Sequence, residues 1–152
     1  MNTKESTNRI LVQVVKDFTT SPEKVFDAWL DTGKLSEWMF GPNVRDEEIV
    51  KLESHPHKGG TFSFVVRRDG QLLNHIGTYL EFSRPYRLVF TWGIESESED
   101  ETVVTIEIKT TEDGCRVTLT HELPEKWAEY TESTEAEWSF MLDKLQKVLS
   151  GL

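Results

Sequence analysis

The sequence predicts an α+β protein in which a curled antiparallel sheet of seven strands grips one long C-terminal helix. Near the end of the chain, Thr134 to Leu149 carries apolar residues at helical spacing along one side. Before it come one strand pattern, two short helix patterns and six further strand patterns, in the order β-α-α-β6-α. A helix with one apolar stripe is not stable alone, so it needs the extended apolar surface that hairpin-linked strands supply.

The chain opens with a predicted strand over Arg9 to Phe18, which is rich in β-branched and apolar residues. A short helix follows. Ser21-Pro22 suits its start, because serine caps the first turn and the N–H that proline lacks is not needed there. A second short helix carries Leu35 and Trp38 at helical spacing. It is expected to end before Gly41-Pro42, since the residue preceding a proline disfavours helical angles.

Six strands separated by turn signals make up the middle of the chain. They are predicted at Glu47 to Ser54, Thr61 to Arg68, Leu73 to Phe82, Arg87 to Gly93, Thr102 to Thr110 and Cys115 to His121. In the third of these strands, apolar residues occur at both odd and even positions, so the sequence does not decide which face of the strand points into the core. In the last, alternation predicts an inward set of Cys115, Val117, Leu119 and His121. Residues 123–133 lack a clear period and are expected to connect the sheet to the last helix.

The last helix is expected to begin at Thr134, because Thr134 and Glu137 have the S/T-x-x-E spacing of a capping box. Gly151 suits its C-terminal cap. Phe140 falls opposite the apolar stripe, so we expect it either beneath residues 127–130 or at a dimer contact. The inner face is predicted to carry Trp138, Met141, Leu142, Leu145, Val148 and Leu149.

Length and composition restrict the class of protein. At 152 residues, one domain over residues 1–152 is expected. A formal net charge of −10 argues against nonspecific binding to nucleic acid or anionic membranes, and half of it comes from residues 95–101, expected to form a solvated hairpin tip. The single cysteine, Cys115, cannot form an intrachain disulfide, and the polar N-terminus lacks the apolar core of a signal peptide. We expect a soluble, cytoplasmic protein.

Several motifs occur in order along residues 9–149. They are Ser21-Pro-Glu-Lys-Val-Phe-Asp-Ala-Trp29, Leu35-Ser-Glu-Trp38, Gly59-Gly60-Thr-Phe62, Gly77-x-Tyr79-x-Glu81, Pro85-x-Arg-Leu-Val-Phe-Thr-Trp92 and Glu137-Trp138-x-x-x-Leu142-x-x-Leu145. The first two resemble the opening of the START-related (SRPBCC) superfamily, which has the helix-grip fold. The others resemble the branch named after the C-terminal domain of the activator of heat-shock-protein-90 ATPase. The acidic-x-Arg pair that this branch often has before the double glycine is absent here.

The resemblance implies a fold rather than a reaction, because its motifs are turn glycines, core aromatics and a helix face. The branch includes a co-chaperone domain, many stand-alone proteins of unassigned role and relatives described as polyketide cyclases. Among reactive residues, His55 and His57 form an H-x-H pair, but the intervening proline indicates a loop and no third ligand is apparent. Neither a metal nor a cofactor is therefore expected.

A curled sheet around one helix often leaves a cavity, and the heavy supply of aromatic residues suits an apolar ligand. The candidate ligand-binding residues are Trp38, Phe62, Phe64, Tyr79, Phe90, Trp92, His121, Trp138, Met141, Leu142 and Leu145. His121 is also interpreted as a hydrogen-bonded structural residue.

Three functions follow as hypotheses. The first is noncatalytic binding of a small hydrophobic or amphipathic molecule between the sheet and the last helix. The second is a chaperone-interaction module resembling the heat-shock-protein-90 activator domain. The third is a small cyclase- or dehydratase-like enzyme using His121, Tyr79 or Glu81. We favour the first, because no matched acid and base can be identified in the sequence.

Overall fold

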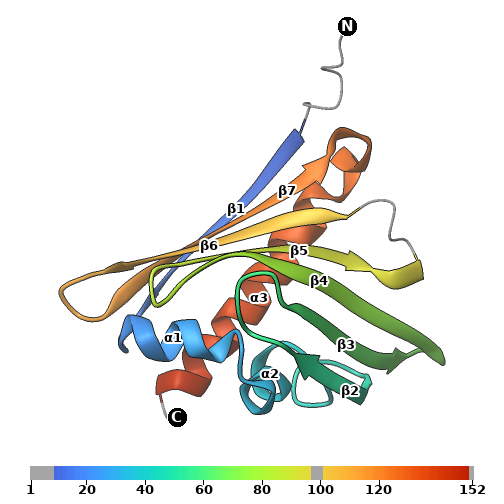
Figure 1. Ribbon diagram of the computed structural model, residues 1–152, viewed down its shortest axis with the longest axis horizontal. Helices are drawn as coiled ribbons and strands as arrows, with labels where there is room; N and C mark the ends of the chain where they lie inside the picture. Colours follow the sequence, from blue (N-terminus) through green and yellow to red (C-terminus); the bar gives the residue numbers. More distant parts are fainter. Residues whose placement is uncertain (1–8, 97–100, 151–152) are drawn as a thin grey trace, which may run out of the picture.

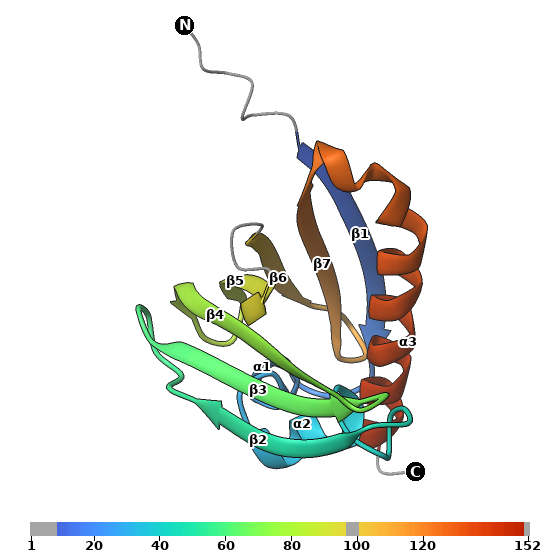
Figure 2. The same ribbon diagram turned by 90° about the vertical axis from the view of Figure 1, so that its right-hand side faces the viewer.

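A computed structural model describes residues 9–96 and 101–150 (Figure 1). Its elements are β1 (Arg9–Phe18), α1 (Pro22–Ala28), α2 (Thr32–Trp38), β2 (Glu48–Ser54), β3 (Thr61–Arg68), β4 (Gln71–Ser83), β5 (Arg87–Ile94), β6 (Thr102–Thr110), β7 (Cys115–Pro124), the 3₁₀ helix η3 (Glu125–Tyr130) and α3 (Thr131–Ser150). The strands form one antiparallel sheet in the order β1-β7-β6-β5-β4-β3-β2. The sheet curls, and α3 runs along its inner side next to β1 (Figure 2). The predicted fold and element order are confirmed.

The two short helices begin as predicted. The Ser21 hydroxyl accepts a hydrogen bond from the Lys24 N–H at 3.3 Å, and Pro22 opens α1. The Asp31 carboxylate caps α2 by accepting from the Gly33 N–H at 2.8 Å. Both helices pack at the end of the fold where α3 finishes (Figure 1). They are fixed to each other because the indole of Trp38 donates to the Ala28 carbonyl at 3.0 Å.

The long helix starts earlier than predicted. It begins at Thr131, directly after η3, so Thr134 lies inside the helix and the predicted capping box does not form. The Glu137 side chain binds Arg45 instead. The inner face is as predicted. Trp138, Met141, Leu142 and Leu145 are buried, and Val148 and Leu149 pack against the core. Gly151 lies outside the described residues.

Strand β4 explains why its inward face could not be settled from the sequence. In the first part of the strand the odd-numbered residues, among them His75 and Tyr79, point inward. The pairing with β5 then shifts register between Tyr79 and Glu81, which is the sign of a β-bulge. Beyond the bulge Phe82 also packs against the core, while Glu81 turns outward and pairs with Arg87. Both parities are therefore inward in different halves of the same strand.

The last strand and the connecting segment differ in detail from the prediction. β7 continues past His121 to Pro124, because Leu123 extends the buried alternation and pairs with Ile10 of β1. The predicted inward set of this strand is confirmed, since all four of its residues are buried. Phe140 is 47% exposed, so η3 does not cover it, and the predicted dimer contact stays a prediction. Among the described residues, no helix is long and apolar enough to span a membrane.

Candidate functional site

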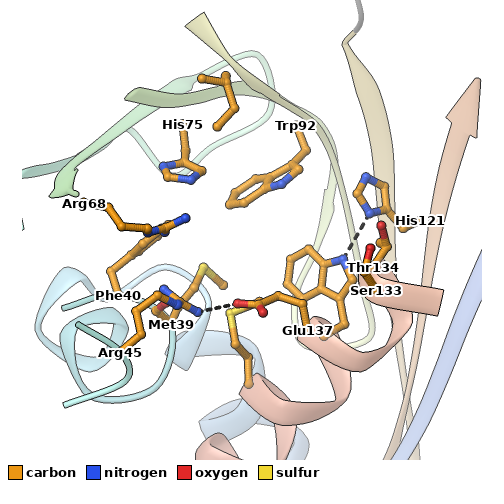
Figure 3. Close-up of a pocket in the computed structure, with 13 residues that line it drawn as sticks. Met39, Phe40, Arg45, Arg68, His75, Trp92, His121, Ser133, Thr134 and Glu137 are labelled. Atoms are coloured by element: carbon orange, nitrogen blue, oxygen red, sulfur yellow. Dashed lines mark hydrogen bonds and ion pairs between the residues drawn. The ribbon is translucent and has the colours of Figure 1, made fainter. Parts of the chain in front are cut away.

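A cavity opens between the first half of α3 and the facing ends of β3, β4, β5 and β7 (Figure 3). Its volume is about 470 Å³. It adjoins a second, outer cavity of about 770 Å³ beneath η3. Because the two share a wall, we treat them as one pocket. The shared residues are Arg68, Trp92, Ile94, His121, Ser133 and Thr134.

One side of the pocket is aromatic. Trp92 projects into it between two other rings, with its ring centroid 5.7 Å from that of Trp138 and 6.5 Å from that of Phe40, to which it is stacked. Met39 and Met141 also line the pocket. Methionine side chains adapt readily to different shapes, so this wall suits a flat apolar ligand whose outline it does not fix closely.

The opposite side holds a buried carboxylate. The Glu47 side chain is 0% exposed, but each of its two carboxylate oxygens accepts hydrogen bonds. Arg68 donates through Nε and Nη2 to Oε1 at 2.9 and 2.7 Å. The Gly41 N–H and Arg45 Nη1 donate to Oε2 at 2.8 and 3.0 Å. Burial alone would raise the pKa of Glu47, but these hydrogen bonds and the two positive charges outweigh burial and lower it. Glu47 is therefore ionised at neutral pH.

Two arginines bring this network to the pocket surface. Arg45 Nη2 donates to Oε2 of Glu137 at 2.6 Å, which links the loop before β2 to α3 across the pocket (Figure 3). The Glu137 side chain is 52% exposed. Arg68 is 35% exposed at its side chain, and its Nη1 has no hydrogen-bond partner among the residues that the structure describes. The pocket therefore presents a free guanidinium N–H group.

His75 adds an acceptor to the same side. Its Nδ1 lies 3.1 Å from the Phe64 carbonyl, which can only accept, so Nδ1 carries the proton of the neutral ring. Burial lowers the pKa of His75 to about 4, so the ring is neutral at pH 7. Nε2 is then an unprotonated acceptor on a ring that lines the cavity. It has no partner within the described part of the chain.

His121 is part of a closed chain of hydrogen bonds. The Trp138 indole can only donate, and it donates to Nδ1 of His121 at 3.0 Å. The proton of the ring therefore sits on Nε2, which donates to the Thr102 hydroxyl at 2.6 Å. That hydroxyl in turn donates to the Trp92 carbonyl at 2.8 Å. Burial lowers the pKa of His121 to about 4. With both nitrogens engaged, His121 positions the two tryptophans of the wall.

The candidate residues from the sequence divide into three groups. Trp92, His121, Trp138 and Met141 line the pocket. Phe62, Phe64, Tyr79 and Phe90, together with Trp92, surround a void of about 10 Å³, which holds at most one water molecule. Three further candidates are fully buried at 0% exposure and pack in the core: Trp38, Leu142 and Leu145. The space between sheet and helix is thus filled along the second half of α3 and open along the first.

Sequence reasoning missed the polar half of the pocket. The lining residues that it missed are Met39, Phe40, Arg45, Arg68, His75, Ile94, Ser133, Thr134 and Glu137; it also missed Glu47, which lies behind the two arginines. Three of the polar ones, Arg45, Glu47 and Arg68, come from a loop or a strand end, where periodicity gives no orientation. One signal was present at positions 133, 134 and 137, where polar residues continue the line of the apolar stripe of α3.

The three residues considered for catalysis do not meet. The Tyr79 hydroxyl is buried and lies 2.8 Å from the Ser54 hydroxyl. Glu81 faces the other side of the sheet, with Arg87 at 2.8 Å. His121 is engaged as described. No group of three or more metal-ligating side chains occurs within residues 9–96 and 101–150, and His55 lies in an exposed loop near Glu53.

Comparison with known proteins places the chain in a family. The profile of the family described as Activator of Hsp90 ATPase homolog 1-like protein matches residues 19–150. No curated protein sequence matches significantly.

Solved structures share the fold. A protein of unknown function from Staphylococcus aureus superposes with a TM-score of 0.81 at 21% identity, over 94% of both chains. A Rhodobacter sphaeroides protein superposes with a TM-score of 0.79 at 22% identity, over 93% of both chains. An AHSA1 protein from Silicibacter pomeroyi superposes with a TM-score of 0.76 at 22% identity, over 93% of this chain and 98% of the other. These structures show the fold, and the profile match over most of the chain shows the family. The chain belongs to the Activator of Hsp90 ATPase homolog 1-like family of the START-related superfamily.

Proposed function

We propose that this protein binds a small amphipathic molecule, without catalysis, in the pocket beneath the first half of α3. Membership of the family supports a ligand-binding domain in general. The observation that carries the more specific proposal is an open cavity of about 470 Å³ with an aromatic wall opposite a polar wall. Typical small-molecule sites have about 300–1,000 Å³ and combine apolar walls with a few placed polar groups.

The two walls define what the ligand should look like. A flat ring of the ligand packs against the exposed part of Trp92, which is half-buried, whereas its neighbours Phe40 and Trp138 are buried behind it. A polar group at the other end meets the free Arg68 Nη1–H and the Nε2 acceptor of His75. Such a ligand satisfies polar groups of the pocket wall that otherwise depend on water, so its polar end fixes its orientation.

Binding without catalysis fits the chemistry of the titratable groups. A general acid or base needs a free proton-transfer site within reach of the ligand. Both nitrogens of His121 are engaged, and those hydrogen bonds hold Trp138 and Thr102 in place. His75 is neutral at pH 7 because burial lowers its pKa to about 4, so it is a weak base and an acceptor rather than an acid.

The test is to fill the pocket from α3. Thr134 lines both cavities and is half-buried, so Thr134→Trp should place an indole where the ligand lies. Ala136→Trp, on the exposed side of the same helix, is the matched control. We would titrate 4-phenylphenol and follow quenching of tryptophan fluorescence, because Trp92 and Trp138 form the wall. Binding should be present in the wild type and the control, and lost in Thr134→Trp. Binding that survives Thr134→Trp, or no binding by the wild type, would refute the proposal.

A further inference from the structure

We infer that the ligand carries a single carboxylate, which displaces Glu137 from Arg45 and also binds Arg68. This inference rests on the proposed function, since it names the charge of the molecule bound in the same pocket. It starts from an imbalance on the polar wall. Two guanidinium groups, Arg45 and Arg68, face one buried carboxylate, Glu47. The wall therefore has one positive charge in excess before Glu137 is counted.

Glu137 neutralises that excess in a way that is easily reversed. The Glu47 side chain is 0% exposed and bound by donors from three residues, whereas the Glu137 side chain is 52% exposed and bound by Arg45 alone. The pair is easily broken because water solvates the half-exposed Glu137 when the two separate, while Arg45 keeps its hydrogen bonds to Glu47 and to the Met39 carbonyl. Glu137 lies on the surface of α3, so its side chain can turn to solvent without disturbing the helix. It occupies the position that a ligand carboxylate would take.

The geometry favours a carboxylate over other anions. Both guanidinium groups bind the oxygens of the same Glu47 carboxylate, so they lie close together, and both line the 470 Å³ cavity (Figure 3). Arg68 Nη1 is free, and Arg45 Nη2 becomes free when Glu137 leaves. A planar carboxylate matches N–H donors of this kind well. One excess charge balances a monoanion, while a dianion such as phosphate would meet a chain of net charge −10.

The probes are biphenyl-4-carboxylate and its neutral counterpart biphenyl-4-carboxamide, which share the same apolar body. Isothermal titration at pH 7 should show the wild type binding the carboxylate about tenfold more tightly than the amide, because charge-assisted hydrogen bonds are the stronger kind. Glu137→Gln removes the competing carboxylate from an exposed position. It should strengthen carboxylate binding several-fold and amide binding much less, because the freed Arg45 Nη2 forms a charge-assisted pair with the carboxylate alone. Glu135→Gln, an exposed glutamate on the same helix, is the matched control and should change neither.

The outcomes separate this inference from the proposed function. Equal binding of the two probes, or an unchanged preference in Glu137→Gln, would overturn the inference and leave the pocket as a binding site for neutral molecules. Failure of both probes and of 4-phenylphenol to bind would overturn both. Arg45→Gln gives a second readout. If it folds, the preference for the carboxylate should disappear; if it does not fold, the result with Glu137→Gln decides.

Discussion

Acidification should destabilise this protein well above the pH at which most carboxylates titrate, because two buried histidines are kept neutral. Burial lowers the pKa values of His75 and His121 from 6.5 to about 4. Between these two pH values the unfolded chain binds protons that the folded chain does not. The free energy of unfolding is therefore at its full value above pH 6.5 and falls as the pH drops toward 4.

The size of the effect follows from the shift. Each histidine lowers the free energy of unfolding by about 1.4 kcal/mol per pH unit in this range, which is roughly 3.5 kcal/mol over the whole interval. Together they remove at most about 7 kcal/mol, a large part of the roughly 5–15 kcal/mol that is typical for a folded domain. His121 is expected to give the larger share, because protonation of Nδ1 would place an N–H against the Trp138 indole N–H. His75 lines the cavity, where water can reach it and reduce its share.

The measurement is urea denaturation at pH 7, 6 and 5. In the double variant His75→Asn/His121→Gln, the amides keep one donor or acceptor at each site but do not titrate. It should be less stable than the wild type at pH 7 and should lose much less stability on acidification. His57→Gln, in an exposed loop, is the control and should follow the wild type. Equal slopes for the wild type and the double variant would refute the reasoning.

Two further predictions concern buried polar groups. Glu47→Gln should lower the free energy of unfolding by about 2–4 kcal/mol, because Arg45 and Arg68 lose their buried counter-charge. The neighbouring exposed Glu48 pairs with Arg67, and Glu48→Gln should cost less than about 0.5 kcal/mol; similar losses in urea melts would contradict this account. Trp38→Phe should cost about 1 kcal/mol more than Trp29→Phe. Trp38 would lose its hydrogen bond to the Ala28 carbonyl, whereas the buried Trp29 Nε1 has no partner in the described structure. A larger loss of stability in Trp29→Phe than in Trp38→Phe would contradict this prediction.

The sequence predicted the elements well because hydrophobic periodicity reports directly on which face of an element is buried. It failed in β4, where a bulge changes the parity within one strand, so that Tyr79 and Phe82 both point inward. A single alternation rule cannot describe such a strand. The start of α3 was wrong for a related reason. Thr134 and Glu137 have the local spacing of a cap, but Glu137 instead forms an ion pair with Arg45, 92 residues away.

The polar half of the site could not be predicted from local pattern. Glu47 lies within Asp46-Glu47-Glu48, and nothing in that run distinguishes the buried carboxylate from its exposed neighbours. What buries it is the convergence of the Gly41 N–H with Arg68, which is 21 residues further along the chain and reaches it from the end of β3. Tertiary structure alone brings these donors together.

The position of the pocket can nevertheless be understood from α3. Moving toward its N-terminus, the face that meets the sheet carries Leu145, Leu142 and Trp138, each buried. One further turn along the same line is Thr134, which lines the cavity instead of filling it. Helix α2 packs against the second half of α3, where the large apolar side chains are. The cavity begins where the apolar stripe ends, because a threonine leaves space that a leucine would occupy. A polar residue that continues an apolar stripe is therefore the sequence feature that marks this pocket, and Thr134→Leu should reduce its volume.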